Sequence, residues 1–376
     1  MNQPSNARFS QLPKLVAVAF ATGLACHGAS ATTISWPQNS QRIGESDCAE
    51  CRLVLADSIT IGDFDGPAAL VPTGFVQRLP DGRLVVGQKD HLKVFSGTGT
   101  FIRIVGREGR GPGEYSGIAG LHYDSDHLWI FDSKQARVTQ LTDKFVVGRM
   151  VPWPFLFPNV AVLPDGRILV NANVPTEERI GFPLHVVDKT GEIVRSFGVQ
   201  TPVARPDLPL YLRRVAVDRE ARIWVSDYHR YIIEQWDTTG TLRESIARRL
   251  EWFPERVPGP VSEPSGRLQP HIQQMKSIGR DTLAVMVVVS DPEWRRATGY
   301  GDNPHGGDRP MIRLSNEYSD TYVDWIDLND RQLIVSTRFD QRITHFADRN
   351  HVYGYWEDEN GIPKVTVWRI ELVQGR

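Results

Sequence analysis

Residues 97–149 constrain the fold of this chain more than any other stretch. Four short runs there are rich in β-branched and aromatic residues, and Gly, Asp, Ser or Pro clusters separate them. The runs are 101–105, 118–123, 127–131 and 137–141. This pattern indicates strands joined by turns, with no interval long enough for a helix. Four strands within about 40 residues predict one blade of a β-propeller.

An internal repeat extends this prediction along the chain. The run LPDGRLVV at 79–86 recurs as LPDGRILV at 163–170. Asp-Gly between two apolar runs favours a hairpin turn, because Gly accepts positive φ without steric cost. Residues that follow such turns mark the expected second strands of six blades: Leu84, Leu128, Ile168, Ile223, Leu283 and Val352. We therefore predict an all-β, six-bladed propeller of four-stranded antiparallel blades.

The two ends of the expected domain, residues 52–376, predict how the ring closes. Residues 343–347, 351–356 and 364–372 supply three strands, one fewer than a blade needs. Residues 52–61 read as a strand without a neighbouring partner. We expect this strand to complete the last blade, which would remove an open sheet edge.

Two long insertions interrupt the later blades. Residues 248–267 are rich in Pro, and residues 291–310 are rich in Gly. Both are expected to be loops. In repeat proteins such insertions tend to lie on one face, which is often the binding face.

The first 31 residues have the pattern of a secretory signal peptide. Arg8 and Lys14 precede an apolar run at 15–25, and Ala29-Ser30-Ala31 offers a cleavage site. We expect a periplasmic or secreted protein. The alternative is a lipid anchor on Cys26, although Gly23 stands where a lipobox would have Leu.

Residues 32–51 are expected to form an irregular leader. Cys48 and Cys51 are its two cysteines, and in an exported protein they predict a local disulfide. A redox motif or a metal site remains open, but no βαβ pattern surrounds the pair and a metal needs more ligands.

The charge balance excludes some classes of partner. The chain has 43 Lys and Arg against 45 Asp and Glu, which gives no basic surplus for nucleic acid. After the signal, no apolar run approaches the roughly 20 residues of a membrane helix. We expect a monomer whose partner is a small anionic ligand or another protein.

Residues 217–242 resemble an NHL repeat. The matching positions are Asp218, Ile223, Val225, Asp227, Arg230, Ile233, Trp236, Asp237 and Gly240, while Ala221 replaces the usual turn glycine. Residues 106–115 (GREGRGPGEY) resemble the junction between blades in bacterial NHL-like six-bladed propellers. The resemblance covers nearly the whole mature chain. It implies the fold but no activity, because propellers of this shape include lyases, lactonases and binding modules.

The starts of the innermost strands should meet at one mouth of the central channel. Candidate ligand-binding residues near these starts are Tyr211, Arg213, Arg214, His271 and Arg342. Converging guanidinium groups would suit a carboxylate, phosphate or sulfate. The alternative is that these residues are ordinary surface charges or partners in salt bridges.

Other polar residues are expected to be structural. Four aspartates recur before turns and are predicted to cap them: Asp132, Asp188, Asp227 and Asp237. The alternative is that such aspartates bind calcium. His185, His229 and His345 fall on expected strands without metal spacing.

No catalytic residue is identified, because neither G-x-S-x-G nor H-E-x-x-H occurs. The sequence favours an exported scaffold that binds a ligand or protein through its loop-bearing channel face, without catalysis. The alternative is a divalent-metal-dependent lyase or lactonase with its site in the channel.

Overall fold

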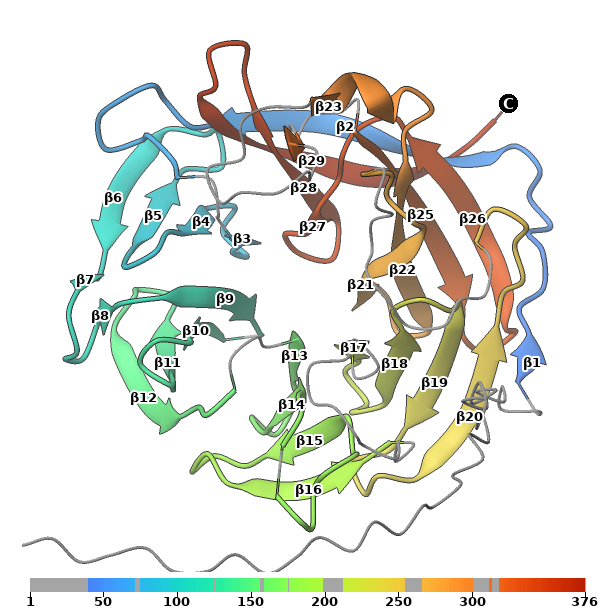
Figure 1. Cartoon of the computed structure of the whole chain (residues 1–376), viewed down its shortest axis with the longest axis horizontal. Helices are drawn as coiled ribbons and strands as arrows, with labels where there is room; N and C mark the ends of the chain where they lie inside the picture. Colours follow the sequence, from blue (N-terminus) through green and yellow to red (C-terminus); the bar gives the residue numbers. More distant parts are fainter. Residues whose placement is uncertain are drawn as a thin grey trace, which may run out of the picture. The chain divides into compact units, whose positions relative to one another are not determined.

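The computed structural model describes residues 40–71, 75–124, 126–155, 159–174, 176–198, 212–253, 266–299, 311–312 and 318–375. The expected signal peptide, Cys26 and Tyr211 lie outside these residues. Within them, six antiparallel sheets surround a central channel (Figure 1). The predicted six-bladed, all-β propeller is confirmed.

The first three blades each contain four consecutive strands, written here from the innermost to the outermost. Blade 1 contains β3 (Val76–Arg78), β4 (Leu84–Gly87), β5 (Leu92–Phe95) and β6 (Phe101–Val105). Blade 2 contains β9 (Ile118–Tyr123), β10 (His127–Asp132), β11 (Arg137–Thr142) and β12 (Val147–Pro152). Blade 3 contains β13 (Asn159–Val162), β14 (Ile168–Asn171), β15 (Leu184–Val187) and β16 (Ile193–Phe197).

Blade 4 has four consecutive strands, blade 5 has an insertion between its second and third strands, and blade 6 includes a strand from the N-terminal region. Blade 4 contains β17 (Arg213–Val217), β18 (Ile223–Asp227), β19 (Ile232–Trp236) and β20 (Leu242–Ala247). Blade 5 contains β21 (His271–Ser277), β22 (Thr282–Ser290), β25 (Ser319–Asp327) and β26 (Gln332–Phe339). Blade 6 contains β27 (His345–Phe346), β28 (His351–Glu357), β29 (Pro363–Gln374) and β2 (Cys51–Ile61). All six anchor residues lie on second strands, as predicted.

The ring closes through β2, which pairs antiparallel with β29 from Cys51↔Gln374 to Ile61↔Val365. The expected closing strand is therefore in the expected blade. Part of the segment expected as an irregular leader is also ordered. In that segment β1 (Gln41–Arg42) runs parallel to β20, and Gly44 bridges to Gln332. Residues 40–61 thus follow the outer edges of blades 4, 5 and 6.

The core lies between neighbouring blades. Trp129 and Phe131 of blade 2 pack against Val170 of blade 3, and Trp224 of blade 4 packs in the cluster that reaches blade 5. These side chains are almost completely buried. Each large aromatic side chain removes a large apolar area from water, which stabilises the packing between blades.

The glycine-rich run between blades 1 and 2 is a linker, as predicted. Its two short strands, β7 (Arg107–Glu108) and β8 (Glu114–Tyr115), pair in parallel. The Gly111 amide donates to a carboxylate oxygen of Glu114 at 2.7 Å. A Cβ on Gly106, whose φ is +83°, would come within 2.6 Å of the Tyr115 ring. The linker therefore needs glycine there for both space and backbone conformation.

Two ends of the channel are defined by the direction of the inner strands. The inner strands begin at the loop end, and they turn into the second strands at the turn end. Because these strands are antiparallel, the residues before β21 and those after β22 both lie at the loop end. There Tyr318 Oη donates to the Gly266 carbonyl at 3.1 Å. The 291–310 insertion is more than a loop, since it contains η2 (Trp294–Ala297) and β23 (Thr298–Gly299), which pairs with β24 (Met311–Ile312).

The recurring aspartates cap turns, as the sequence predicts. Asp237 Oδ1 accepts from the amides of Thr239 and Thr241 at 2.9 and 3.0 Å. Asp132 Oδ1 accepts from Lys134 and Gln135 in the same way. Separately, no helix among the described residues has the length and apolarity to cross a membrane.

Candidate functional site

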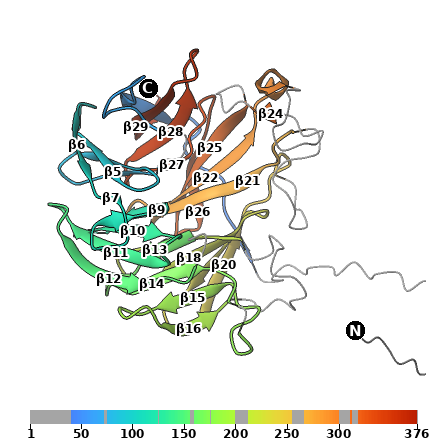
Figure 2. The same ribbon diagram turned by 60° about the vertical axis from the view of Figure 1, so that its left-hand side comes forward.

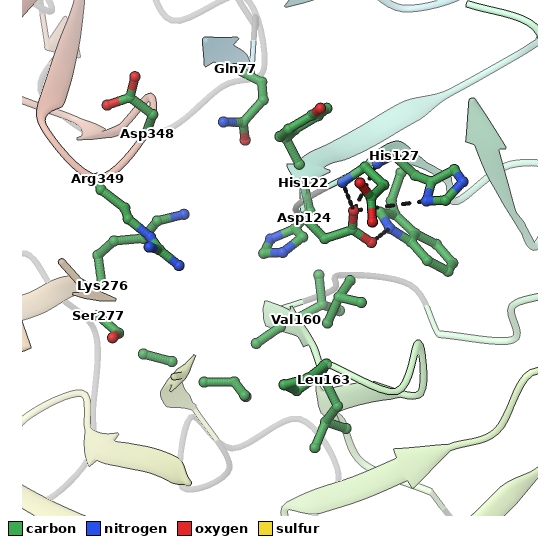
Figure 3. A pocket seen from close by; sticks show the side chains of 18 of the residues that line it. Gln77, His122, Asp124, His127, Val160, Leu163, Lys276, Ser277, Asp348 and Arg349 are labelled. Carbon is green, nitrogen blue, oxygen red and sulfur yellow. Dashed lines mark hydrogen bonds and ion pairs between the residues drawn. The ribbon is translucent and has the colours of Figure 1, made fainter. Parts of the chain in front are cut away.

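A cavity of about 1000 Å³ occupies the turn end of the channel. All six blades contribute to it through the last residues of their inner strands and the turns that follow. Figure 3 shows His122, Lys276 and Gln77 pointing into this space from different blades. The cavity is therefore a property of the closed ring rather than of one blade.

The sequence places polar residues here for a structural reason. Second strands such as β4 (LVVG) and β14 (ILVN) are buried along their whole length between neighbouring blades. The inner strands have the channel on one edge, so their last residues can line it. Thus β3 ends in Gln77-Arg78 and β21 ends in Lys276-Ser277.

The acidic residues around the cavity are largely engaged with other protein groups. Asp348 pairs with Arg78 at 3.3 Å and with His351 at 2.8 Å. Burial opposes its ionisation, but the hydrogen bonds from His351 and the Asn350 amide lower the pKa of Asp348 below its usual value. Asp218 accepts from Arg222 Nε at 2.6 Å, and Asp124 accepts from Trp129 Nε1 at 2.7 Å.

Five of the six Lys or Arg side chains that line the cavity are not engaged in this way with any described residue. Two of them, Arg149 and Lys189, belong to blades 2 and 3, and the other three are Lys276, Arg349 and Arg219. Lys276, Arg349 and Arg219 make no side-chain hydrogen bond or ion pair with any residue in the described part of the chain. Burial lowers the pKa of Lys276, which Asp348 partly opposes and Arg349 reinforces. Burial and the charge of Arg219 lower the pKa of Arg349. Lys276 is therefore the cation whose charge burial disfavours most clearly, whereas Arg219 and Arg349 are exposed.

His122 faces the same space from blade 2 (Figure 3). Burial and the positive charge of Lys276 lower the pKa of His122 to about 3. The imidazole is therefore neutral at pH 7. Among the described residues, neither of its ring nitrogens has a hydrogen-bond partner, so one donor and one acceptor remain for a ligand.

An apolar wall lies on another side of the cavity. It comprises β13 with its turn and the end of β17: Val160, Val162, Leu163, Pro164, Val215 and Val217. Figure 3 shows Val160 and Leu163 across the cavity from Lys276 and Arg349. The cavity thus has apolar strand ends at blades 3 and 4 that face two cations from blades 5 and 6, with charged residues such as Asp218 and Arg219 in the turns beside the apolar strand ends.

The predicted ligand-binding residues that the structure describes lie at the loop end instead, and none lines this cavity. Arg214 lies 4.5 Å over the Tyr228 ring, and His271 stacks on the same ring at 4.7 Å. Arg342 Nη1 donates to the Tyr355 carbonyl at 3.1 Å. Arg213 differs from them, since it pairs with Asp227 at 3.4 Å.

Two of these arginines, Arg214 and Arg342, lie close enough to His345 to affect its pKa. Burial, Arg214 and Arg342 together lower the pKa of His345 to about 3. Burial lowers the pKa of His271 to about 4, with a further contribution from Arg214. Arg214, His271 and Arg342 therefore belong to one group at the loop end, whereas Tyr211 lies outside the described residues.

The remaining candidates have structural surroundings. The ring of His185 contacts Ser196 Oγ at 2.8 Å and the Ala172 carbonyl at 3.2 Å, and that of His229 packs edge-on against Tyr228. Cys48 and Cys51 form a disulfide in the structure. Among the described residues, no group of three or more His, Cys, Asp or Glu is arranged to hold a metal ion.

His122, Lys276, Arg219 and Arg349 were missed because the sequence reasoning considered where inner strands begin, not where they end. The signal was available. The second-strand anchors locate each preceding turn, so polar residues just before Leu128 and Leu283, together with those around the other turns, could have been assigned to the turn end.

Comparisons with known proteins agree on the fold. Residues 78–200 match the family model DUF5128, described as a 6-bladed β-propeller. No curated protein sequence matches the chain. A DUF4221 member from Bacteroides vulgatus is similar in structure, with a TM-score of 0.58 and 12% identity over 87% of this chain and 99% of that one.

Two further solved structures are similar at low identity. A protein from Bacteroides fragilis, inferred to be exported, has a TM-score of 0.54 and 12% identity, covering 90% of this chain and 99% of its own. Virginiamycin B lyase from Staphylococcus aureus has a TM-score of 0.42 and 10% identity, covering 85% and 99%. At these identities the first two similarities establish the fold and nothing about activity.

Proposed function

We propose that this chain is an exported propeller that binds a small organic anion in the turn-end cavity, without catalysis. One observation carries the proposal. The acidic side chains there are largely engaged with protein partners, while Lys276, Arg349 and Arg219 have none among the described residues. A bound anion would supply the missing partner.

The energetics favour an anion over a neutral ligand. A hydrogen bond to a charged group contributes about 1.5–3 kcal/mol, more than one between neutral groups. Lys276 is also partly withdrawn from water, so its charge acts through a lower dielectric than at the surface. Neutral His122 adds a donor and an acceptor without opposing the negative charge.

Titration calorimetry with small carboxylates, phosphate and sulfate tests this proposal. Lys276→Met retains the length of the side chain and removes its charge, so we expect binding to weaken roughly 10- to 100-fold. Lys144→Met is the matched control, because Lys144 is exposed in the turn between β11 and β12, outside the cavity. Equal affinity in both variants and in the unmodified protein would refute the proposal.

Export is supported by the signal-like run before residue 32, by the Cys48–Cys51 disulfide and by the fold shared with the Bacteroides fragilis protein. Fractionation and N-terminal sequencing test it. We expect a mature chain that starts near Ala31 outside the cytoplasm. A chain retained in the cytoplasm with Met1 present would contradict export, and a lipid on Cys26 would identify the anchored alternative.

A second candidate is a divalent-metal-dependent lyase or lactonase that uses the channel. His122 favours it, because a neutral imidazole without a protein partner among the described residues can ligate a metal. Metal analysis of the purified mature protein separates the two candidates. A tightly held stoichiometric ion would support the enzyme, and a stable metal-free protein that binds anions would support the scaffold.

A further inference from the structure

We infer that the ligand is an amphipathic monocarboxylate, with its carboxylate against Lys276 and Arg349 and its apolar body along β13 and β17. This inference rests on the proposed function and specifies the ligand class. It is carried by the apolar residues at the ends of β13 and β17, which face Lys276 and Arg349 across the cavity, while Asp165, Asp218 and Arg219 lie in the turns beside them.

The cationic side is built from two neighbouring blades. Lys276 comes from the end of β21 in blade 5, and Arg349 comes from the turn between β27 and β28 in blade 6. Asp348, next to Arg349, is already held by Arg78 and His351. Asp348 therefore leaves Lys276 and Arg349 available to donate hydrogen bonds to the two oxygens of one carboxylate.

The apolar side is built from blades 3 and 4. Val160 and Val217 are half-buried, and each also packs against a core cluster between blades. Leu163 is only 2% exposed and fixes the base of the turn after β13. A wall of this kind offers a polar ligand no hydrogen bonds, whereas an apolar body placed there would leave water favourably.

The charge of the lining favours a single negative charge. Six Lys or Arg side chains and five Asp side chains line the cavity. Among these Lys, Arg and Asp side chains there is an excess of one positive charge. A monoanion would neutralise it, while a dianion would place a second negative charge near the engaged aspartates.

The size of the cavity favours an organic ligand over an inorganic ion. Its volume of about 1000 Å³ lies at the upper end of the roughly 300–1,000 Å³ usual for small-molecule sites. An ion such as sulfate would contact the cationic side and leave the apolar wall wet. A chain or ring behind the carboxylate would fill that space.

Calorimetry with acetate, butanoate, hexanoate, octanoate and decanoate tests the inference on the full mature protein. We expect one site per chain and an affinity that rises about two- to fourfold per added methylene. Octanamide, which lacks the charge, should bind far more weakly than octanoate.

Two variants distinguish the contribution of the carboxylate to binding from that of the apolar chain. Lys276→Met should weaken binding of every member by a similar factor. The double variant Val160→Thr and Val217→Thr retains β-branched shape, so it should fold, and it should flatten the dependence on chain length while acetate is little affected. Circular dichroism checks that both variants are folded.

The outcomes distinguish the inference from the proposed function. Carboxylates that bind with an affinity independent of chain length would overturn the inference and leave the anion site in place. Tighter binding of the dicarboxylate suberate than of octanoate would overturn the inference that the ligand carries a single negative charge. Failure of every carboxylate and inorganic anion to bind would overturn both.

Discussion

At the scale of single residues, His185 shows how burial fixes a protonation state. It is completely buried on β15. Since the Ala172 carbonyl can only accept, Nε2 donates to it, and Nδ1 accepts from the Ser196 hydroxyl. Burial lowers the pKa of His185 to about 4, with a smaller opposing effect from the Ala172 carbonyl.

This histidine predicts a loss of stability in mild acid. The unfolded chain takes up a proton near pH 6.5, whereas the folded chain does so only near pH 4. The unfolded state therefore gains protons first as the pH falls, and folding stability decreases across that window. Between pH 7 and 5, His185→Gln should lose less unfolding free energy than the unmodified protein, by on the order of 2 kcal/mol. Urea titrations at both pH values measure this, and parallel pH profiles would contradict it.

Gly354 on β28 lies where a larger side chain would clash, although its backbone conformation does not require glycine. A Cβ there would lie 2.4 Å from the Arg342 carbonyl oxygen, which is backbone and cannot easily move. Gly354→Ala should reduce the free energy of unfolding by about 1–3 kcal/mol. Gly148→Ala on β12 is the control, since a Cβ there would lie 3.5 Å from the Gln140 carbonyl oxygen, an ordinary van der Waals contact. Equal melting temperatures for the two variants would count against this packing.

At the scale of elements, the outer strands are covered unequally. Residues 40–61 accompany the edges of blades 4, 5 and 6, while β6, β12 and β16 form the outer edges of blades 1 to 3 (Figure 2). Of the N-terminal strands, β2 has the longest pairing, along nearly the whole of β29. Its loss would expose those backbone groups and part of the core around Leu53 and Ile61.

Deletion of residues through Ile61 should therefore abolish cooperative unfolding or cause aggregation. The matched control removes only residues 1–39, which leaves β1 and β2 in place. Thermal melts followed by circular dichroism and by light scattering compare the two proteins. Unchanged melting of the shorter chain would mean that β2 is dispensable for closing the ring.

Elements were predictable from the sequence because their signals are local. Asp-Gly turns mark the first hairpins of blades 1 and 3, and short apolar runs bounded by turn residues mark the other strands. The shortage of one strand at the C-terminus indicated β2. The short strand β1 was missed because Gln41–Arg42 has no apolar pattern and is held by pairing with β20 alone. The cavity was missed because six separate turns form it, and only the closed ring brings Lys276 opposite His122.

At the scale of the whole propeller, the start of β2 lies beside the end of β29. Cys51 and Gln374 are directly opposite in register. A two-residue Asn-Gly turn could join them as an ordinary hairpin. Moving residues 51–61 behind Gln374, with a new start at Gly62, should therefore give a folded circular permutant.

We expect this permutant to melt cooperatively within a few degrees of its control. The control is the unpermuted chain that begins at residue 51, and Cys51→Ser in both proteins avoids an unpaired thiol. Calorimetry and binding of the same anions compare the two. An insoluble permutant beside a folded control would show that blade 6 depends on the native order of its strands.

The pairing of β2 with β29 also determines when the propeller can finish folding during synthesis. Cys51 is synthesised more than 300 residues before its partner Gln374. The strand β2 can therefore pair only after β29 has been synthesised, because contacts this distant in sequence cannot form until the intervening chain exists. A chain interrupted before residue 363 has no β29, so its β2 remains without its partner. The propeller can therefore be completed only after residue 374 has been synthesised.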